Sequence, residues 1–350
     1  MLNLLAFAIC LIMAISFTPL IRKLAFRIGA VDQPNSRKVH TRIMPRLGGL
    51  AIILSFLIGF IAMGLDNKLA WGILPGAIII ALIGVFDDLY ELSAKVKFGG
   101  QLIAAGVTVL GGIQIEAITF PFGDRIEFGV LAVPITIFWI VAITNAINLI
   151  DGLDGLAAGV SAIALLTISG LAISMGNNYV ALVGILLLGS TVGFLKFNFY
   201  PAKIFMGDTG ALFLGYMISI LSIMGLFKSV TFFSLIVPVI ILGVPLLDTF
   251  FAIVRRMVQN KPLASPDKLH LHHCLLKLGY THKQTVILIY ILSSLFSIAA
   301  LIFTNTTLWG SLITLFTVLI MIELLVELTG LISENYRPIL NLVDSYRLRK

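Results

Sequence analysis

The residues best suited to chemistry lie in a polar stretch, 145–156, which separates two long apolar runs near the middle of the sequence. Asn148, Asp151 and Asp154 follow one another at steps of three, and a glycine follows each aspartate. At a helix end this spacing places the three side chains on a broad shared face. Aspartates that only cap helices and glycines that only make turns would give the same pattern. A second stretch in a similar setting, 197–210, favours a functional site.

Further polar clusters lie between other apolar runs. Asp87-Asp88 closes one run, and Lys95 and Lys97 follow it. Adjacent carboxylates at a membrane boundary repel one another unless they share a cation, a lysine or a proton. The later clusters contribute Asn198, Lys203, Phe205, Asp208, Arg255, Arg256, His270, His272 and His273.

Three of the five histidines fall within residues 270–273, and such a cluster is typical of a metal or anion site. Cys274 is adjacent, but the pattern lacks the paired spacing of a zinc site, so zinc is the weaker interpretation. Carboxylate and amide oxygens suit Mg²⁺ or Mn²⁺, which take one or two carboxylates plus substrate phosphates. Acids combined with Lys, Arg and His therefore indicate a metal-bridged phosphate whose remaining charge is met by cations.

Membrane helices must position these clusters. The 350 residues are 59% apolar and 12% charged, with a mean hydropathy of +1.06, whereas a soluble domain is about 45–50% apolar and about 25% charged. We therefore predict an all-α polytopic membrane protein with about eleven spans in one bundle. The cysteines, Cys10 and Cys274, imply no disulfide framework. The predicted spans are 2–21, 47–65, 70–86, 102–117, 129–147, 157–175, 179–195, 211–226, 232–254, 285–303 and 308–328.

The distribution of positive charge predicts the orientation of these spans. Of the 24 Lys and Arg residues, all but Lys68, Arg125 and Lys228 fall on one side. The positive-inside rule assigns that side to the cytoplasm, with the N-terminus outside and the C-terminus inside. We treat residues 1–330 as a single polytopic domain and 331–350 as a short basic cytoplasmic tail. The polar connections on the cytoplasmic side are 22–46, 87–101, 148–156, 196–210 and 255–284.

In their order along the chain, these motifs resemble those of the polyprenyl-phosphate N-acetylhexosamine-1-phosphate transferases, glycosyltransferase family 4. The resemblance extends from about Gly29 to Thr285 and is most similar to the bacterial branch that initiates wall teichoic acid. The muramoyl-pentapeptide branch differs in its histidine segment, where this chain has His-Leu-His-His. The motifs that carry the resemblance are 31–40, 45–49, Asp87-Asp88, 148–155, 198–210 and 270–273.

The resemblance implies transfer of GlcNAc 1-phosphate from UDP-GlcNAc to undecaprenyl phosphate, with Mg²⁺ as cofactor and Mn²⁺ as the other candidate. The products would be undecaprenyl-diphospho-GlcNAc and UMP, formed at the cytoplasmic face of the bacterial cell membrane. The expected partners are the two substrates and the lipid bilayer, with no nucleic acid, and members of this family can form homodimers. Another UDP-N-acetylhexosamine is the alternative donor.

The same resemblance implies roles for individual residues. Asp208 is the leading Mg²⁺ ligand, with Asn148 or Asp151 contributing. Asp87 or Asp88 would act as the base on the lipid phosphate. Direct attack is favoured because that phosphate is already an oxyanion, and an aspartate nucleophile stays an alternative. The other expected contacts are Asp154, Asn198, Phe205 and Arg255 to the nucleotide sugar, and Lys97, His270, His272 and His273 to the diphosphate.

Two other classes of membrane protein compete with an enzyme. A transporter would explain acidic residues in or near apolar runs, such as Glu116, Asp248, Glu323 and Glu327. Transporters, however, place their site near the bilayer midplane between related halves, whereas these polar groups gather at span ends and no repeat is visible. A noncatalytic scaffold would not require a metal-compatible set of acids. The pattern therefore favours an enzyme over both.

Overall fold

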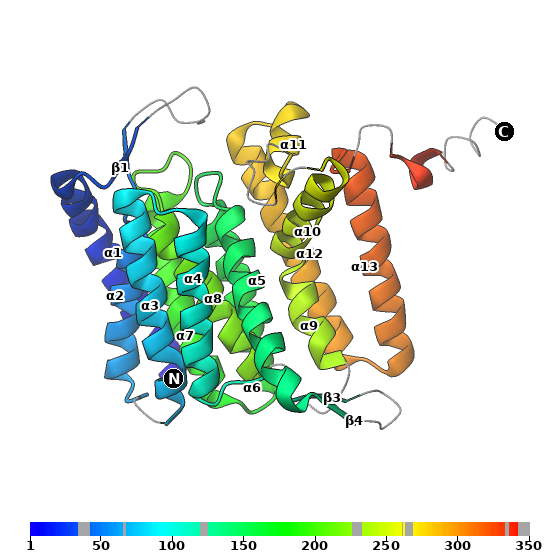
Figure 1. Ribbon diagram of the computed structural model, residues 1–350, viewed down its shortest axis with the longest axis horizontal. Coiled ribbons are helices and arrows are strands. Elements are labelled where there is room, and N and C mark those ends of the chain that lie inside the picture. Colours follow the sequence, from blue (N-terminus) through cyan, green and yellow to red (C-terminus); the bar gives the residue numbers. More distant parts are fainter. Residues whose placement is uncertain are drawn as a thin grey trace. The chain divides into compact units, whose positions relative to one another are not determined.

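The computed structural model describes residues 1–33, 43–65, 68–119, 125–225, 233–260, 262, 269–332 and 336–341. Most of the motif 31–40 and the last residues of the basic tail lie outside this set. The chain divides into two compact units, Met1–Pro238 and Val239–Lys350 (Figure 1). The extent of a single domain over residues 1–330 stays a prediction.

Eight helices form most of the first unit, and helix α8 lies at its centre. Every residue from Thr209 to Gly225 of α8 is buried, and α8 packs against α3, α5, α6 and α2. Because the rest of α8 is buried, only side chains at its polar start can take part in a site. The helices are α1 (Leu2–Ile28), α2 (Gly49–Ala62), α3 (Lys68–Tyr90), α4 (Ala94–Leu110), α5 (Ala132–Leu149), α6 (Leu156–Ser174), α7 (Asn178–Asn198) and α8 (Gly207–Gly225).

Two short antiparallel strand pairs lie at opposite ends of this unit (Figure 1). One pairs β1 (Val31–Asp32) with β2 (Met44–Pro45), and the other pairs β3 (Ala117–Thr119) with β4 (Arg125–Glu127). A 3₁₀ turn, η1 (Gly129–Leu131), precedes α5. The all-helical prediction therefore holds for the spans, and the strands are additions in the connections.

The second unit contains the end of α9 (Phe233–Ile241), then α10 (Gly243–Val258), α11 (Leu271–Lys277), α12 (His282–Asn305) and α13 (Leu308–Thr329). Helix α12 begins with a capping box, in which the Thr281 side chain and the Gln284 side chain each accept a backbone N–H of the other residue. Helix α12 packs against α13, α10 and the short α11.

The described residues contain eight helices that are long and apolar enough to cross a membrane. A polytopic α-helical membrane protein is thus confirmed, but the count of eleven spans and the orientation of the termini are not. Helices α2 and α4 have only 14 and 17 residues. The predicted span 232–254 is interrupted at Leu242, where α9 ends and α10 begins.

The fourth predicted span, 102–117, was placed too late in the chain. The helix runs from Ala94 to Leu110, because the Ser93 side chain accepts the backbone N–H of Val96 at 3.5 Å and caps it. Helix α3 likewise continues to Tyr90. Asp87, Asp88 and Lys97 therefore stand on helices rather than in a loop.

Candidate active site

Four of the predicted site residues meet where α3, α4, α5 and α8 approach one another. The Lys97 Nζ donates to Asp208 Oδ2 at 2.8 Å and to Asp87 Oδ2 at 3.2 Å. The Asn148 Nδ2 donates to Asp208 Oδ1 at 3.2 Å. These residues are widely separated in sequence, so the helix ends bring them together. A half-buried lysine shared by two carboxylates relieves their repulsion.

Asp88 has a different environment from its neighbour. Its Oδ1 accepts the backbone N–H of Asp208 at 3.0 Å, and its Oδ2 accepts the backbone N–H and the hydroxyl of Thr209 at 3.0 and 2.6 Å. The carboxylate thus caps the N-terminus of α8, where a negative charge is favoured by the helix dipole. Asp88 therefore holds Asp208 in place, and Thr209 takes part in this contact. The sequence did not reveal this positioning role.

Asp87 is free of such a structural task. It is buried, its Oδ2 contacts Lys97, and its Oδ1 has no hydrogen-bond partner among the described residues. A buried carboxylate oxygen without a partner is costly, because its desolvation is not compensated. The orphaned oxygen is the kind of atom that a substrate group or a cation would satisfy.

Glycines permit the close approach of three helices at this point. A Cβ added to Gly84 of α3 would meet the backbone of Thr209, and one added to Gly49 of α2 would meet the backbone of Gly210. Gly207 has φ = 71°, a conformation that favours glycine. The start of α8 can therefore lie directly against α2 and α3.

Arg46 is a cationic residue of the cluster; it belongs to the motif 45–49, but the sequence assigned it no role of its own. Its Nε lies 3.6 Å from Asp88 Oδ1, and its Nη1 lies 3.6 Å from Asp32 Oδ1 and 3.4 Å from Glu91 Oε1. Its position before two glycines was the available signal. Arg46 therefore adds positive charge beside the carboxylate that caps α8.

The segment that carries Arg46 also fixes the backbone of Phe205. The Phe205 N–H donates to the Pro45 carbonyl at 2.8 Å, and the Phe205 carbonyl accepts the Gly48 N–H at 3.0 Å. The Gly49 N–H donates to Met206 O at 2.8 Å. The backbone of the half-buried Phe205, three residues before Asp208, is consequently fixed by main-chain bonds.

Asp154 and Asn198 join the turn after α5 to the loop before α8. Asp154 Oδ2 accepts the Ala202 N–H at 2.9 Å. The buried Asn198 accepts the Gly155 N–H at 3.1 Å and donates to the Ile204 carbonyl at 3.0 Å. These bonds connect the two polar stretches, 145–156 and 197–210, directly to each other. Contacts of either residue with a nucleotide stay a prediction.

Asp151, in the turn after α5, is a further acidic residue close to this cluster. Burial, and then the nearby carboxylates of Asp208 and Asp88, raise the pKa of Asp151 to about 8. The Asp151 carboxyl is therefore held largely in its protonated form at neutral pH, first by burial and then by the neighbouring carboxylates. The cluster would therefore be stabilised by an added cation.

The residues present fit the Mg²⁺ that the family resemblance implies. Among the described residues, no group of three or more His, Cys, Asp and Glu side chains is arranged to hold a metal. Magnesium commonly takes only one or two carboxylates and completes its shell with water and substrate phosphates. Asp208, with the orphaned oxygen of Asp87 beside the same lysine, provides such a partial set of hard oxygen donors.

The predicted histidines and Arg255 belong to the second unit. His270 Nδ1 lies 2.9 Å from Asp248 Oδ2, and the rings of His270 and His272 are parallel within 3° at 5.9 Å. Burial and the neighbouring His273 lower the pKa of His272 to about 3, so its ring is neutral at physiological pH. The buried Arg255 donates to the Leu331 carbonyl at 2.7 Å, which ties the end of α10 to the residue after α13.

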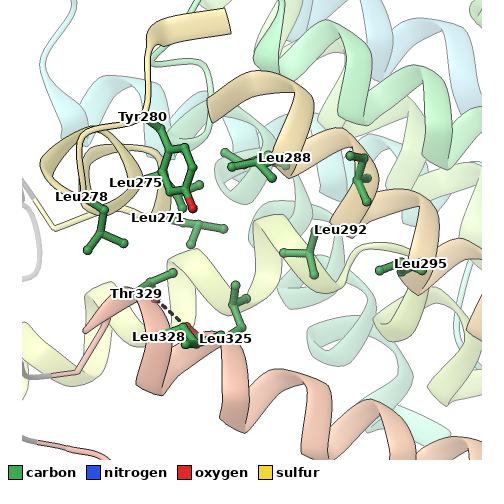
Figure 2. A pocket seen from close by; sticks show the side chains of 12 residues that line it. Leu271, Leu275, Leu278, Tyr280, Leu288, Leu292, Leu295, Leu325, Leu328 and Thr329 are labelled. Carbon is green, nitrogen blue, oxygen red and sulfur yellow. Dashed lines mark hydrogen bonds between the residues drawn. The ribbon is translucent and has the colours of Figure 1, made fainter. Parts of the chain in front are cut away.

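An apolar cavity of about 510 Å³ lies beside the histidine helix α11 (Figure 2). Its walls come from α11, α12 and α13, with Leu271 and Leu275 of α11 near Leu325 and Leu328 of α13. Leu271, Leu275 and Leu278 share one face of the chain around α11. Leu271 and Leu275 are buried on this face, whereas Leu278 is exposed.

Comparison with known proteins relates the chain to one group of enzymes. Residues 70–226 match the family model described as glycosyl transferase family 4. A probable undecaprenyl-phosphate N-acetylglucosaminyl 1-phosphate transferase of Bacillus subtilis is 49% identical over 95% of this chain and 94% of its own length. A decaprenyl-phosphate N-acetylglucosaminephosphotransferase of Mycolicibacterium smegmatis is 36% identical over 77% of this chain and 74% of its length. A phospho-N-acetylmuramoyl-pentapeptide-transferase of Chlorobium chlorochromatii is 33% identical over 77% of this chain and 81% of its own length.

Proposed function

The chain belongs to glycosyl transferase family 4, and from this membership we propose that it transfers GlcNAc 1-phosphate from UDP-GlcNAc to undecaprenyl phosphate. The observation that carries the proposal is the near full-length similarity to the Bacillus subtilis relative, whose printed name gives this acceptor and this sugar phosphate. The second candidate donor is another UDP-N-acetylhexosamine, such as UDP-GalNAc.

In the proposed reaction an oxygen of the lipid phosphate attacks the β-phosphorus of the nucleotide sugar. The new bond joins that oxygen to phosphorus, and the bond between the β-phosphorus and the bridging oxygen of UMP breaks. Asp87 is suited to take up a proton from the acceptor phosphate, because its carboxylate is not committed to the scaffold. Lys97, which lies between Asp87 and Asp208, can donate to the phosphate oxygens and offset their charge.

Asp208, with Asn148 or Asp151 beside it, would hold Mg²⁺. When bound, the ion would neutralise phosphate charge and polarise the phosphorus centre. Asp88 and Thr209 keep the Asp208 backbone at the start of α8. The Phe205 side chain, whose backbone is fixed by main-chain bonds, would stack on the uracil ring.

The proposal also covers the side of the membrane on which the reaction takes place and the use of its product. The excess of Lys and Arg in the connections that carry Arg46, Lys97 and Lys203 supports a cytoplasmic site, where a water-soluble UDP-sugar is at hand. The lipid-linked product would then start a cell-wall polymer. The similarity of motifs 31–40 and 45–49 to the teichoic-acid branch supports a wall teichoic acid linkage unit.

The decisive test combines purified protein, undecaprenyl phosphate, Mg²⁺ and separate UDP-sugars, with UMP release as readout. We expect release with UDP-GlcNAc and a much smaller rate with UDP-GalNAc or UDP-linked muramoyl pentapeptide. No release with any donor would refute the transferase. A radiolabelled phosphosugar that stays on the protein when lipid phosphate is withheld would replace direct attack with an aspartate nucleophile.

A further inference from the structure

Asn145 is the first residue of the polar stretch 145–156, and the proposed reaction does not yet use it. On α5 it faces Gln101 of α4, and the two side-chain amides exchange hydrogen bonds. Asn145 Nδ2 donates to Gln101 Oε1 at 2.6 Å, and Gln101 Nε2 donates to Asn145 Oδ1 at 3.3 Å. Asn145 Nδ2 also donates to the Val141 carbonyl at 2.8 Å. We call Gln101 and Asn145 the amide pair.

The contact with Val141 determines how both amides are turned. A carbonyl oxygen can only accept hydrogen bonds, so the NH₂ group of Asn145 must lie toward Val141. The oxygen of Asn145 is then left for the NH₂ group of Gln101. Gln101 is 3% exposed, and turning either amide over would leave buried polar groups unpaired at a high cost. The amide pair therefore has one favourable arrangement.

The amide pair lies one helical turn from two residues of the candidate site. Gln101 follows Lys97 by four residues on α4, and Asn145 precedes Asn148 by three residues on α5. Each spacing places the two residues of one helix on the same face. Lys97 and Asn148 donate to different oxygens of Asp208. Two helices thus hold one carboxylate, and the amide pair joins the same two helices.

The amide pair can fix the register of α4 and α5 more sharply than apolar packing. Helix α4 buries Gln101 together with small residues such as Ala104 and Ala105. Small side chains let helices approach closely, and in a membrane no hydrophobic effect drives helices together. Hydrogen bonds, by contrast, weaken steeply when their geometry is lost. Sliding or rotation of α4 against α5 would therefore break the bonds of the pair first.

We propose that Gln101 and Asn145 are positioning residues, which keep α4 and α5 in the register at which two donors reach the oxygens of Asp208. Neither amide needs to touch a reactant for this role, because it acts through Lys97 and Asn148. The effect on transfer rests on the proposed function. The register itself can be measured without turnover.

Paired apolar substitutions separate positioning from a contribution to stability alone. Gln101→Met and Asn145→Leu each keep the approximate shape of the side chain but leave the partner amide unpaired, so each should lower the unfolding temperature in detergent. The double variant leaves neither amide unpaired, and its unfolding temperature should return toward that of the wild type. We expect its kcat to stay lower by about tenfold or more, because small displacements of reacting groups are costly, while KM for UDP-GlcNAc stays within about threefold.

An exchanged pair and a control on the same helix complete the test. Gln101→Asn combined with Asn145→Gln restores two facing amides, and its kcat should exceed that of the apolar double variant. Thr108 of α4, two turns beyond Gln101, contacts the Tyr216 hydroxyl of α8 at 2.5 Å. Thr108→Val removes this buried interhelical bond and should leave kcat within about twofold of the wild type.

Three kinetic results would overturn the inference. A wild-type kcat in the apolar double variant would show that the register does not depend on the amides. An equal loss of kcat in Thr108→Val would show that any lost bond on α4 has the same effect. A loss of kcat/KM caused wholly by a higher KM would place the amides against a substrate instead.

Spin labels measure the register of the two helices directly. Labels on the exposed Ile103 of α4 and Phe138 of α5, in a background without Cys10 and Cys274, report the distance between these helices. We expect a shifted or broader distance distribution in the apolar double variant and an unchanged one in Thr108→Val. Identical distributions in the unmodified protein and the apolar double variant would refute the proposed role. If the unmodified protein releases no UMP, the proposed function fails, whereas these distances still decide the register.

Discussion

Asp87 and Asp88 are adjacent in the chain but have separate roles in the structure, and this difference can be measured. Asp88 accepts three hydrogen bonds at the start of α8, whereas Asp87 keeps one buried oxygen without a partner among the described residues. Sequence alone assigned the base to either residue. The contacts favour Asp87 as the base and Asp88 as the group that holds the site.

We expect Asp87→Asn and Asp88→Asn to fail in different ways. Asp87→Asn should lower single-turnover UMP release by about 10²-fold or more with little change in unfolding temperature. Asp88→Asn places an NH₂ group against N–H donors, so it should also lower the free energy of unfolding by about 1.5–3 kcal/mol. Thermal unfolding in detergent beside single-turnover kinetics separates them. Equal stability of the two variants would contradict the capping role of Asp88.

Asp208→Asn tests the proposed metal ligand at the same scale. The substitution keeps the shape of the side chain and removes the charge that Lys97 and Asn148 contact. We expect single-turnover UMP release at saturating Mg²⁺ to fall by about 10³-fold or more, because metal catalysis contributes several kcal/mol.

Glu91→Gln is the control for this loss of charge. It removes an exposed carboxylate beside Arg46, and surface ion pairs contribute little. Its rate should stay near that of the wild type. Near-normal turnover of Asp208→Asn would exclude Asp208 as an essential ligand.

At the scale of elements, the site depends on α8 starting directly against α2 and α3. Gly84→Ala would press a methyl group into the backbone of Thr209, and overpacking of this kind typically costs about 1–3 kcal/mol. Because the methyl displaces the residues around Asp208, we expect UMP release to fall at least tenfold, by about the free energy of that strain.

Gly106→Ala on α4 is the matched control for this substitution. No atom outside the local helix lies within 4 Å of the added Cβ, and alanine is the better helix former. Its activity should be unchanged, and its stability equal or higher. Full activity of Gly84→Ala would show that the close packing of α3 and α8 does not set the reactive geometry.

The elements also show where a sequence is informative and where it is not. Long apolar runs predicted helices because a membrane demands internally satisfied backbones. The start of α4 was missed because Lys95 and Lys97 suggested a loop, although Ser93 caps a helix there. The pairing of Gly48 and Gly49 with Phe205 and Met206 joins distant segments, so no local pattern could reveal it.

The candidate site was predictable in the same partial way. The carboxylates and amides at span ends singled out Asp208 and Asn148, and the structure brings Asp208 within hydrogen-bond distance of both Asn148 and Lys97. Asp248 resembled an isolated acid in an apolar run, because its histidine partner follows only after a long connection. Arg46 lies in the motif 45–49, but no local pattern shows that its side chain reaches Asp88.

For the whole molecule, the orientation in the membrane stays a prediction with a direct test. We expect an introduced cysteine at the exposed Lys283 to resist an impermeant maleimide in intact cells, because the positive-inside rule places it in the cytoplasm. A cysteine at the exposed Thr306, at the other end of α12, should react. Both variants belong in a background without Cys10 and Cys274. Labelling at Lys283 would overturn the assigned side.

The last turn of α3 has a consequence for inhibitors and resistance. Successive residues on a helix point about 100° apart, so Asp87 directs its carboxylate toward Lys97 and Asp88 directs its carboxylate toward the start of α8. A compound that binds Asp87 and Lys97 would therefore contact two side chains whose positions are fixed by the packed helices around them. We expect few escape substitutions there, since a change that evades the compound would also disturb the proposed transfer reaction.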